Sequence, residues 1–393
     1  MGPFMTNTAD AVVIGGGILG VSTAHFLAKL GFGSVVLLEK RTLAAVSTGH
    51  SAAAIRTFYS NPLTIQLANR AVEMFSNSDR EIGGDCGFNQ VGYLTLLSLE
   101  ALDAGRQVVE MERAVGIRVE ELTRDEIHDR LPMVDLDGID CGVLEPDSGY
   151  VDPVKTTRTL ASSAEAWGLT VYEGVGATGI RMDRGRVTGV ETDQGSINTP
   201  VVVNAAGGWG GRVGSWVGMN YSLRWSREVD IVLEVPFDTD AFPWLSDPQV
   251  RFYTRQAGPR QLLVGLGFPK EIEPLDIDSY SEELDAPTRQ RIERLLFERI
   301  PSAKDSQLVR GWASMYTITD DWHPLVGSEP DVPGYYACVA GNGHCFKLGP
   351  PIGESLAHMI AGKEPPSDLY PLRPSRFVEG DYFTSVWGGG NRA

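Results

Sequence analysis

The sequence predicts an α/β fold, in which a domain with a parallel sheet is joined to a second, α+β domain with an antiparallel sheet. Three observations indicate this fold. The N-terminal segment contains a strand, a glycine turn, a helix and a second strand in succession. Short β runs separated by Gly- and Asp-containing turns occupy much of the middle of the chain. The length of 393 residues suits about two domains.

The N-terminal segment has the clearest pattern. Residues 11–14 form a short apolar run followed by glycines, which indicates a buried parallel strand. Residues 18–30 place their apolar side chains on one helical stripe, and Gly31 ends the helix. Residues 34–38 form a second β run. Together these segments make one βαβ unit.

The later elements follow from proline positions and from short β runs. Pro153 lies near the first turn of a helix that extends to about residue 167. A hairpin is expected to turn at residues 257–259. The other expected elements are helices at 286–299 and 351–360 and strands at 169–172, 178–182, 187–192, 201–204, 250–253 and 261–265.

Composition excludes several classes of function. The net charge of −17 argues against a nucleic-acid partner, which would need a basic face. No run of apolar residues is long enough to span a membrane, and no secretory signal precedes the first strand. We therefore expect a cytoplasmic protein with reduced thiols. No metal site and no disulfide framework are expected, because the cysteines have no paired spacing; they are Cys86, Cys141, Cys338 and Cys345.

A glycine motif lies between the first strand and the first helix. Gly15, Gly17 and Gly20 form G-x-G-x-x-G, which permits a tight turn, a close approach to a pyrophosphate and close packing of helix on strand. Glu39 ends the second strand, where a carboxylate accepts hydrogen bonds from ribose hydroxyls and disfavours a 2′-phosphate. The motif predicts a Rossmann-like FAD/NAD(P)-binding domain. By itself it does not separate FAD from NAD.

Four later segments resemble the D-amino-acid-oxidase-like flavoenzymes. They are Gly311-Trp312 and residues 205–209, 319–324 and 341–350, and they occur in the order of that family. The chain is most similar to the sarcosine oxidase and glycine oxidase branch. The resemblance implies that the cofactor is FAD. In the last segment, a glycine loop would approach the pyrimidine side of the flavin, and a helix starting near Pro351 would direct its positive end there.

Motif and resemblance together predict the residues that contact FAD. They come from the glycine turn, the end of the second strand, the segment after it and the family segments. The predicted contacts are Gly15, Gly17, Ile18, Leu19, Gly20, Glu39, Lys40, Ser47, Thr48, His50, Ser51, Ala52, Val175, Ala205, Gly207, Trp209, Gly341, Gly343, His344, Phe346 and Lys347.

The predicted domains follow from these assignments. The FAD-binding domain is discontinuous, the substrate-binding domain is inserted into it, and a C-terminal tail lies along the surface. The limits are 9–84, 146–214 and 311–365 for the first, 85–145 and 215–310 for the second, and 366–393 for the tail.

Residues 47–59 are expected to form a helix that packs against the pyrophosphate and the flavin ring. Arg56 lies in a small, apolar part of this segment, so it is either an ion-pair anchor or a carboxylate receptor. Monomeric sarcosine oxidases bind the substrate carboxylate with an arginine three residues before a tyrosine and with a lysine in a G-H-x-F-K loop. Arg56 before Tyr59, and Lys347 after Gly343-His344, match these positions. The resemblance thus implies a carboxylate clamp.

His344 in the same loop and Tyr253 on the expected hairpin are further candidates for the catalytic site. Three departures from the sarcosine enzymes bear on the chemistry. Ser314 replaces the cysteine that links to FAD, so that thioether cannot form. Gly265 occupies the position of the oxygen-activating lysine, and Pro269 the position of a histidine. FAD is therefore expected to be non-covalent. A second hypothesis is a covalent link at His50, as in dimethylglycine-type dehydrogenases.

The predicted reaction is hydride transfer from the Cα–H of a neutral amino acid, or of an N-substituted, sarcosine-like one, to flavin N5. The resulting imine is hydrolysed, and O2 or an electron-transfer acceptor takes the electrons. One alternative is a 2-hydroxy acid dehydrogenase on the same scaffold. Another is the flavin-holding subunit of a hetero-oligomeric, sarcosine-oxidase-like complex.

Overall fold

The computed structural model describes residues 5–268, 270–272 and 274–387. Pro269, which was compared above with a histidine of the sarcosine enzymes, lies outside the described residues. So do residues 388–393 at the end of the predicted tail. No helix in the described part is long and apolar enough to cross a membrane.

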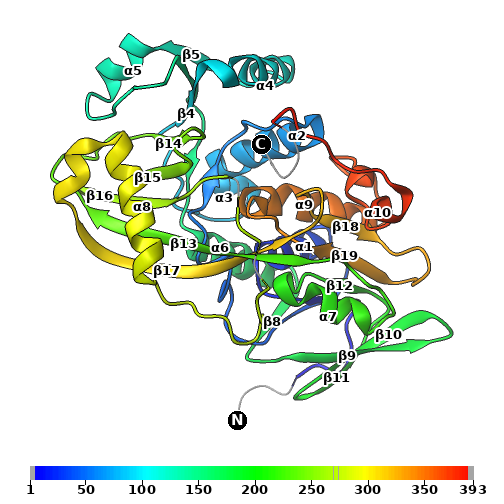
Figure 1. The fold of residues 1–393 in the computed structure, drawn as a ribbon. Coiled ribbons are helices and arrows are strands. Elements are labelled where there is room, and N and C mark those ends of the chain that lie inside the picture. Colours follow the sequence, from blue (N-terminus) through cyan, green and yellow to red (C-terminus); the bar gives the residue numbers. More distant parts are fainter. Residues whose placement is uncertain (1–4, 269, 273, 388–393) are drawn as a thin grey trace.

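A mixed sheet forms the centre of the molecule (Figure 1). Its strand order within the described chain is β18-β19-β12-β1-β2-β8. β1 (Ala11–Ile14) is fully buried and pairs in parallel with β2 (Val35–Glu39) on one side and β12 (Val202–Asn204) on the other. The other strands are β8 (Leu169–Glu173), β19 (Tyr335–Val339) and the antiparallel β18 (Leu325–Ser328). The predicted βαβ unit is confirmed.

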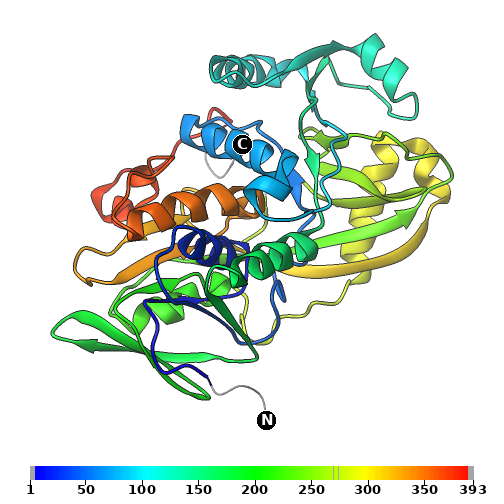
Figure 2. The ribbon, with the colours of Figure 1, turned by 180° about the vertical axis from the view of Figure 1, so that it is seen from behind.

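Three helices lie side by side on one face of this sheet, α1 (Ile18–Lys29) between α6 (Pro153–Glu165) and α9 (Cys345–Ile360), as Figure 2 shows. α1 and α9 approach closely through glycines. A Cβ on Gly349 would lie 2.8 Å from Ile18 Cγ1, and one on Gly353 would lie 2.6 Å from the backbone of Ser22. Gly349 lies against Ile18, and Gly353, one turn later, lies against Ser22. The two helices therefore run in the same direction, and their N-termini meet at one end of the sheet.

The opposite face of the mixed sheet is covered by a small antiparallel sheet and a short helix. Val12 and Val36 from the central strands share a buried core with Val187 and Val190. The covering elements are β9 (Ala177–Asp183), β10 (Arg186–Thr192), β11 (Gly195–Asn198) and α7 (Gly210–Ser215).

A larger, mainly antiparallel sheet forms the second part of the molecule. Its order in the described chain is β17-β13-β16-β15-β14-β4-β6-β5, with only β14 and β4 parallel. α8 (Ala286–Arg299) packs on it through Ile292 and Leu296. The strands are β4 (Tyr93–Leu97), β5 (Glu120–Thr123), β6 (Cys141–Glu145), β13 (Arg224–Glu234), β14 (Trp244–Asp247), β15 (Phe252–Gly258), β16 (Gln261–Leu266) and β17 (Gln307–Ile318).

The other helices and strands lie outside the two large sheets and the small antiparallel sheet. They are α2 (Pro62–Ser76), α3 (Ser78–Glu81), α4 (Leu102–Ala114), α5 (Arg124–Arg130), α10 (Arg376–Glu379) and the paired strands β3 (Ala54–Ile55) and β7 (Gly149–Tyr150). The predicted fold class is confirmed, as are the helix at 286–299 and the hairpin of β15 and β16. The exact domain limits stay a prediction.

Two local expectations were wrong. Residues 47–59 form turns and β3 instead of a helix, because Ala53 has a positive φ of 54° and β3 pairs with β7. The C-terminal helix begins at Cys345 instead of near Pro351, so Pro350 and Pro351 lie inside it. The proline rule failed here because the turn at Gly343, with φ of 71°, starts the helix earlier.

The buried ion pair between Arg299 and Asp247 gives the first prediction. Arg299 Nε donates to Asp247 Oδ2 at 2.5 Å, and their side chains are only 4% and 0% exposed. Arg299→Ala should lower the free energy of unfolding by about 3–5 kcal/mol, because it leaves a buried carboxylate uncompensated. Urea unfolding followed by far-UV circular dichroism measures this.

The matched control is Arg113→Ala, which removes an exposed arginine paired with Glu121 at 2.9 Å. It should change the free energy of unfolding by less than about 1 kcal/mol. Equal losses in the two variants would contradict a structural role for the buried pair.

Candidate active site

Three cavities with shared walls form one continuous track. The first, of about 190 Å³, lies beside the glycine turn. It shares Ser47 and Thr48 with a middle cavity of about 110 Å³. The middle cavity in turn shares Ser51, Tyr316 and Gly343 with a large cavity of about 390 Å³. The track therefore leads from a nucleotide-sized cradle to a separate chamber. We call these the cradle, the ring cavity and the large cavity.

The glycine turn leaves no room for side chains. Gly15 has φ of 118°, and a Cβ there would lie 2.3 Å from Ala205 O. A Cβ on Gly20 would lie 2.0 Å from Gly15 O, so α1 packs directly on the end of β1. Both clashes are with backbone and could not be relieved by a rotamer change. The turn thus has the shape that a pyrophosphate at a helix N-terminus requires.

Polar side chains hold the turn in place. Gly16 N donates to Glu39 Oε2 at 2.7 Å, and Ile18 N donates to Thr48 Oγ1 at 3.0 Å. Glu39 also lines the cradle, and its carboxylate oxygens can each accept more than one hydrogen bond. These groups fit the nucleotide half of FAD.

The lining of the cradle also contains Val175, Ala205, Gly207 and Trp209. Lys40 Nζ lies 3.3 Å from the centroid of the Trp209 ring. Trp209 Nε1 in turn donates to Asp278 Oδ1 at 2.7 Å. A cation and an aromatic face therefore flank the nucleotide end of the track.

The N-terminus of α9 faces the ring cavity. Asn342 and Gly343 have positive φ values of 49° and 71°, and the turn they form places Cys345 and Phe346 on the cavity wall. Ile18 and Leu19 of α1 line the same cavity. Two helix N-termini thus direct their partial positive charges to one place, which favours a group that becomes negative on reduction.

The large cavity brings together the two predicted cations. Arg56 and Lys347 both line it and are 8% and 4% exposed. Lys347 Nζ donates to the Tyr59 hydroxyl at 3.0 Å, while the Arg56 guanidinium lies 4.1 Å from the centroid of the Tyr59 ring. Tyr59 therefore spaces the two cations on one side of the cavity. His344 lines the same cavity, and its ring centroid lies 5.6 Å from that of Tyr59.

Two buried carboxyl groups lie behind Arg56. Glu145 accepts from the backbone and the hydroxyl of Thr57. Burial, and then the neighbouring Glu145, raise the pKa of Glu112 to about 9, so Glu112 is protonated at neutral pH. Burial raises the pKa of Glu145 as well, against the effects of Thr57 and Arg56. The two carboxyl groups therefore place at most one negative charge behind Arg56 at neutral pH.

Aromatic side chains from the large sheet form another part of the cavity wall, and the Arg56 guanidinium lies 5.5 Å from the centroid of the Tyr93 ring. Tyr93 stacks on Trp244 with ring centroids 5.8 Å apart, and Trp244 stacks on Tyr253 at 5.6 Å. The Tyr253 hydroxyl donates to Asp230 Oδ1 at 2.7 Å. Burial raises the pKa of Asp230 to about 6, against the effect of this hydrogen bond. The wall suits the apolar part of a small ligand.

Gly265 lies under this wall. A Cβ there would lie 2.2 Å from Asp230 Oδ1 and 2.4 Å from the Tyr253 hydroxyl oxygen. The hydrogen-bonded pair thus fills the space that a side chain at this position would need. A lysine at position 265 could not be accommodated without displacing it.

The sequence-predicted residues fall almost entirely on this track. Gly20 lies behind the cradle and acts through packing, and His50 lines none of the three cavities. His50 Nδ1 is buried without a hydrogen-bond partner in the described chain. Every other predicted cofactor or catalytic residue lines at least one cavity. The described residues contain no group of three His, Cys, Asp or Glu side chains placed to hold a metal ion.

Sequence reasoning missed several residues of the large cavity. Tyr93, Trp244, Phe268 and Trp387 line it, but they come from four separate segments. Trp244 and Tyr93 are paired across β14 and β4, the one parallel pair of the large sheet, which no local pattern predicts. In the sequence, Tyr59 served only to identify the motif that contains Arg56, whereas in the structure its hydroxyl accepts a hydrogen bond from Lys347. A tertiary structure was needed to bring these residues together.

Comparisons with known proteins agree with this geometry. The family model described as FAD dependent oxidoreductase matches residues 10–359. The chain is 31% identical to mitochondrial sarcosine dehydrogenase of Mus musculus, over 95% of this chain and 42% of that protein. It is 25% identical to sarcosine oxidase subunit beta of Rhizobium meliloti (strain 1021), over 94% of this chain and 89% of that protein.

A solved structure supports the same grouping. The crystal structure of L-proline dehydrogenase from P. horikoshii superposes with a TM-score of 0.89 at 25% identity, covering 96% of this chain and 100% of that one. The chain spans only 42–45% of the length of the mitochondrial sarcosine and dimethylglycine dehydrogenases that it matches. From the family match and the glycine cradle together, the chain belongs to the family of FAD-dependent oxidoreductases.

Proposed function

We propose that this protein oxidises the C–N bond of an amino acid or of an N-substituted, sarcosine-like amino acid. The observation that carries the proposal is the pair of buried cations, Arg56 and Lys347, on the large cavity that adjoins the ring cavity. A guanidinium and an ammonium held about one phenol ring are suited to a single carboxylate. The similarity to sarcosine dehydrogenase and to sarcosine oxidase subunit beta supports the same class of substrate.

The residues of the chain would orient the substrate. Arg56 and Lys347 hold the carboxylate, and the aromatic wall of Tyr93, Trp244 and Tyr253 excludes water from the apolar part. Bound FAD supplies a hydride acceptor at its N5 position. The oxidised substrate is an imine, which water hydrolyses to a keto or aldehyde acid and an amine. No acid–base dyad is needed when the amine is bound in its neutral form.

The proposed cofactor linkage is non-covalent. Ser314 offers no thiol for a thioether, and His50 lies outside the lining of the cavities. We also propose a cytoplasmic location, because all four cysteines are free thiols and three are buried.

The proposed acceptor is an electron carrier instead of O2. Asp230 and Tyr253 fill the space at Gly265. The resemblance aligns this position with the oxygen-activating lysine of the sarcosine oxidases, although glycine oxidases use O2 without it. The similarity to sarcosine oxidase subunit beta also favours a second candidate function, that of a flavin-holding subunit whose activity needs partner chains.

An anaerobic substrate panel tests the proposed reaction. Amino acids and N-methylated amino acids should bleach the flavin absorption band of the purified chain, and matching 2-hydroxy acids should not. When air is admitted, the band should return slowly and with little peroxide. Bleaching by hydroxy acids alone would indicate the 2-hydroxy acid dehydrogenase. Bleaching by no member of the panel would favour the subunit function.

The carboxylate clamp gives a second test. Arg56→Gln or Lys347→Gln should raise the Kd of the amino-acid substrate at least about 30-fold, since each removes a charged donor from a desolvated site. The control substrate is the same amine without its carboxylate, whose Kd should change little. FAD content and melting temperature verify that both variants are folded. An equal loss for the two substrates would contradict the clamp.

The proposed mechanism also predicts a pH dependence. The ammonium group of the substrate must lose its proton before hydride can leave Cα. The rate of anaerobic flavin reduction at low substrate should therefore rise about tenfold per pH unit below the pKa of the amine and level off above it. Stopped-flow absorbance measures this rate. A rate that does not change between neutral and alkaline pH would contradict oxidation of a neutral amine.

A further inference from the structure

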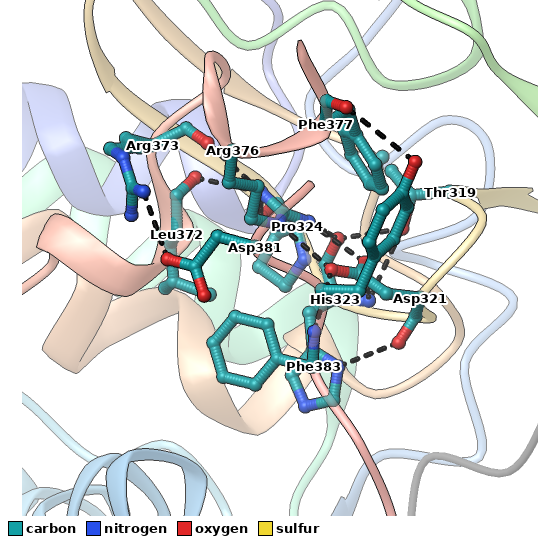
Figure 3. Close-up of polar contacts among 12 residues, drawn as sticks. Thr319, Asp321, His323, Pro324, Leu372, Arg373, Arg376, Phe377, Asp381 and Phe383 are labelled. Atoms are coloured by element: carbon teal, nitrogen blue, oxygen red, sulfur yellow. Dashed lines mark hydrogen bonds and ion pairs between the residues drawn. The ribbon is translucent and has the colours of Figure 1, made fainter. Parts of the chain in front are cut away.

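The C-terminal segment is anchored beside the active site by a fully buried arginine. Arg376 Nε and Nη2 donate to the two carboxylate oxygens of Asp321, each at 2.8 Å, and both side chains are at most 1% exposed. The remaining donors reach the carbonyl oxygens of His323, Pro324 and Leu372 (Figure 3). The chain after α10 therefore starts from a fixed point next to the loop of residues 319–324.

The segment then runs toward the large cavity. Gly380 reverses the chain with a φ of 75°, and the Phe383 ring stacks on His323 at 4.0 Å between centroids. Burial lowers the pKa of His323 to about 4, so the stacked ring is neutral. The edge of His323 in turn meets His344, a residue of the cavity wall, at 5.6 Å. Figure 3 shows Phe383 against His323.

The last described residues of the segment reach the cavity wall. The hydroxyls of Ser385 and Ser60 are 2.9 Å apart, which joins the C-terminal segment to the stretch that follows Tyr59. Trp387 lines the large cavity, and its ring lies 6.1 Å from that of Phe58. It packs on an apolar cluster that contains Phe58, Leu97 and Val143. Among the described residues, Trp387 is the one residue that the C-terminal segment supplies to the wall of the large cavity. Tryptophan has the largest side chain of the common amino acids.

The contact of Trp387 depends on packing. Its Nε1 is buried and has no acceptor in the described chain. An unpaired buried donor destabilises the position that it occupies, so the ring must be held by its apolar surface. A phenylalanine at this position would keep an aromatic ring in contact with the cluster and remove the unpaired donor.

We propose that Trp387 is a specificity-determining residue, whose indole ring closes the Phe58 side of the large cavity and limits the size of the carboxylate ligand. The inference rests on the proposed function, because it takes the ligand to be a carboxylate held by Arg56 and Lys347. Phe58 lies between Arg56 and Trp387, since Arg56 Nη1 donates to its carbonyl oxygen and its ring is 6.1 Å from that of Trp387. A substituent that extends from the carboxylate toward Phe58 would therefore meet the indole.

The test compares acetate with phenylacetate as ligands of the FAD-loaded protein. The Kd of each is measured from the perturbation of the flavin absorption spectrum, without turnover. In Trp387→Ala, the ratio of the Kd of phenylacetate to that of acetate should fall about tenfold or more, because the wall is removed. Trp387→Phe should stay closest to the wild-type ratio, and Trp387→Leu should lie between Trp387→Phe and Trp387→Ala.

The matched control is Trp167→Ala, which removes a 41% exposed tryptophan that lines none of the three cavities and should leave the ratio unchanged. If both carboxylates bind and the ratio is the same in Trp387→Ala and in wild type, the size limit is wrong while the carboxylate site stands. If neither carboxylate binds the wild-type protein, the proposed function and this inference are both overturned.

Discussion

The close packing of α1 against α9 is the constraint on which the site depends. Gly349 and Gly353 let the two helices approach until no Cβ fits between them, and the parallel alignment places both N-termini at the same end of the mixed sheet. α1 is buried along nearly its whole length, so it cannot shift without opening the core. The glycine turn before α1 and the glycine loop before α9 thus both line the ring cavity. The N-termini of α1, at residue 18, and of α9, at residue 345, therefore direct their partial positive charges into the same cavity.

The charge around Arg56 depends on the burial of the neighbouring carboxyl groups as well as on their distance from it. Arg56 is inside the protein, where an unopposed guanidinium would be costly. Glu145 lies behind Arg56 and is held by Thr57, and burial raises the pKa of both Glu145 and Glu112, that of Glu112 to about 9. At neutral pH the two carboxyl groups therefore carry at most one negative charge between them.

The two large sheets contribute different parts of the site. The mixed sheet and its helices supply backbone turns, which suit phosphates and the polar edge of a flavin. The antiparallel sheet supplies the side-chain wall of Tyr93, Trp244 and Tyr253. β3 and the residues after it lie between the two, so Arg56 and Tyr59 can face a wall formed by the other sheet. The C-terminal segment crosses the same region and is fixed by Arg376.

The sequence by itself determined the elements whose cause is local. Gly15 and Gly20 are required by a turn whose backbone leaves no space for a Cβ, and Asp285-Ala286-Pro287 begins a helix through its own capping group. The resemblance also placed Arg56 and Lys347 in the site, because their motifs are short and continuous. Local rules failed where neighbours in space decide the backbone. Residues 47–59 are not helical because β7 pairs with β3, and α9 begins before its prolines.

Only the tertiary structure decided how the large cavity is closed. Tyr93, Trp244 and Trp387 belong to three distant segments with no shared motif, and Tyr59 gained its role only through contact with Lys347. Glu112 is an ordinary helix residue in the sequence, yet burial beside Glu145 changes its charge. The physical reason is the same in each case. A local pattern fixes backbone geometry, whereas the environment of a side chain depends on residues that only folding brings into contact.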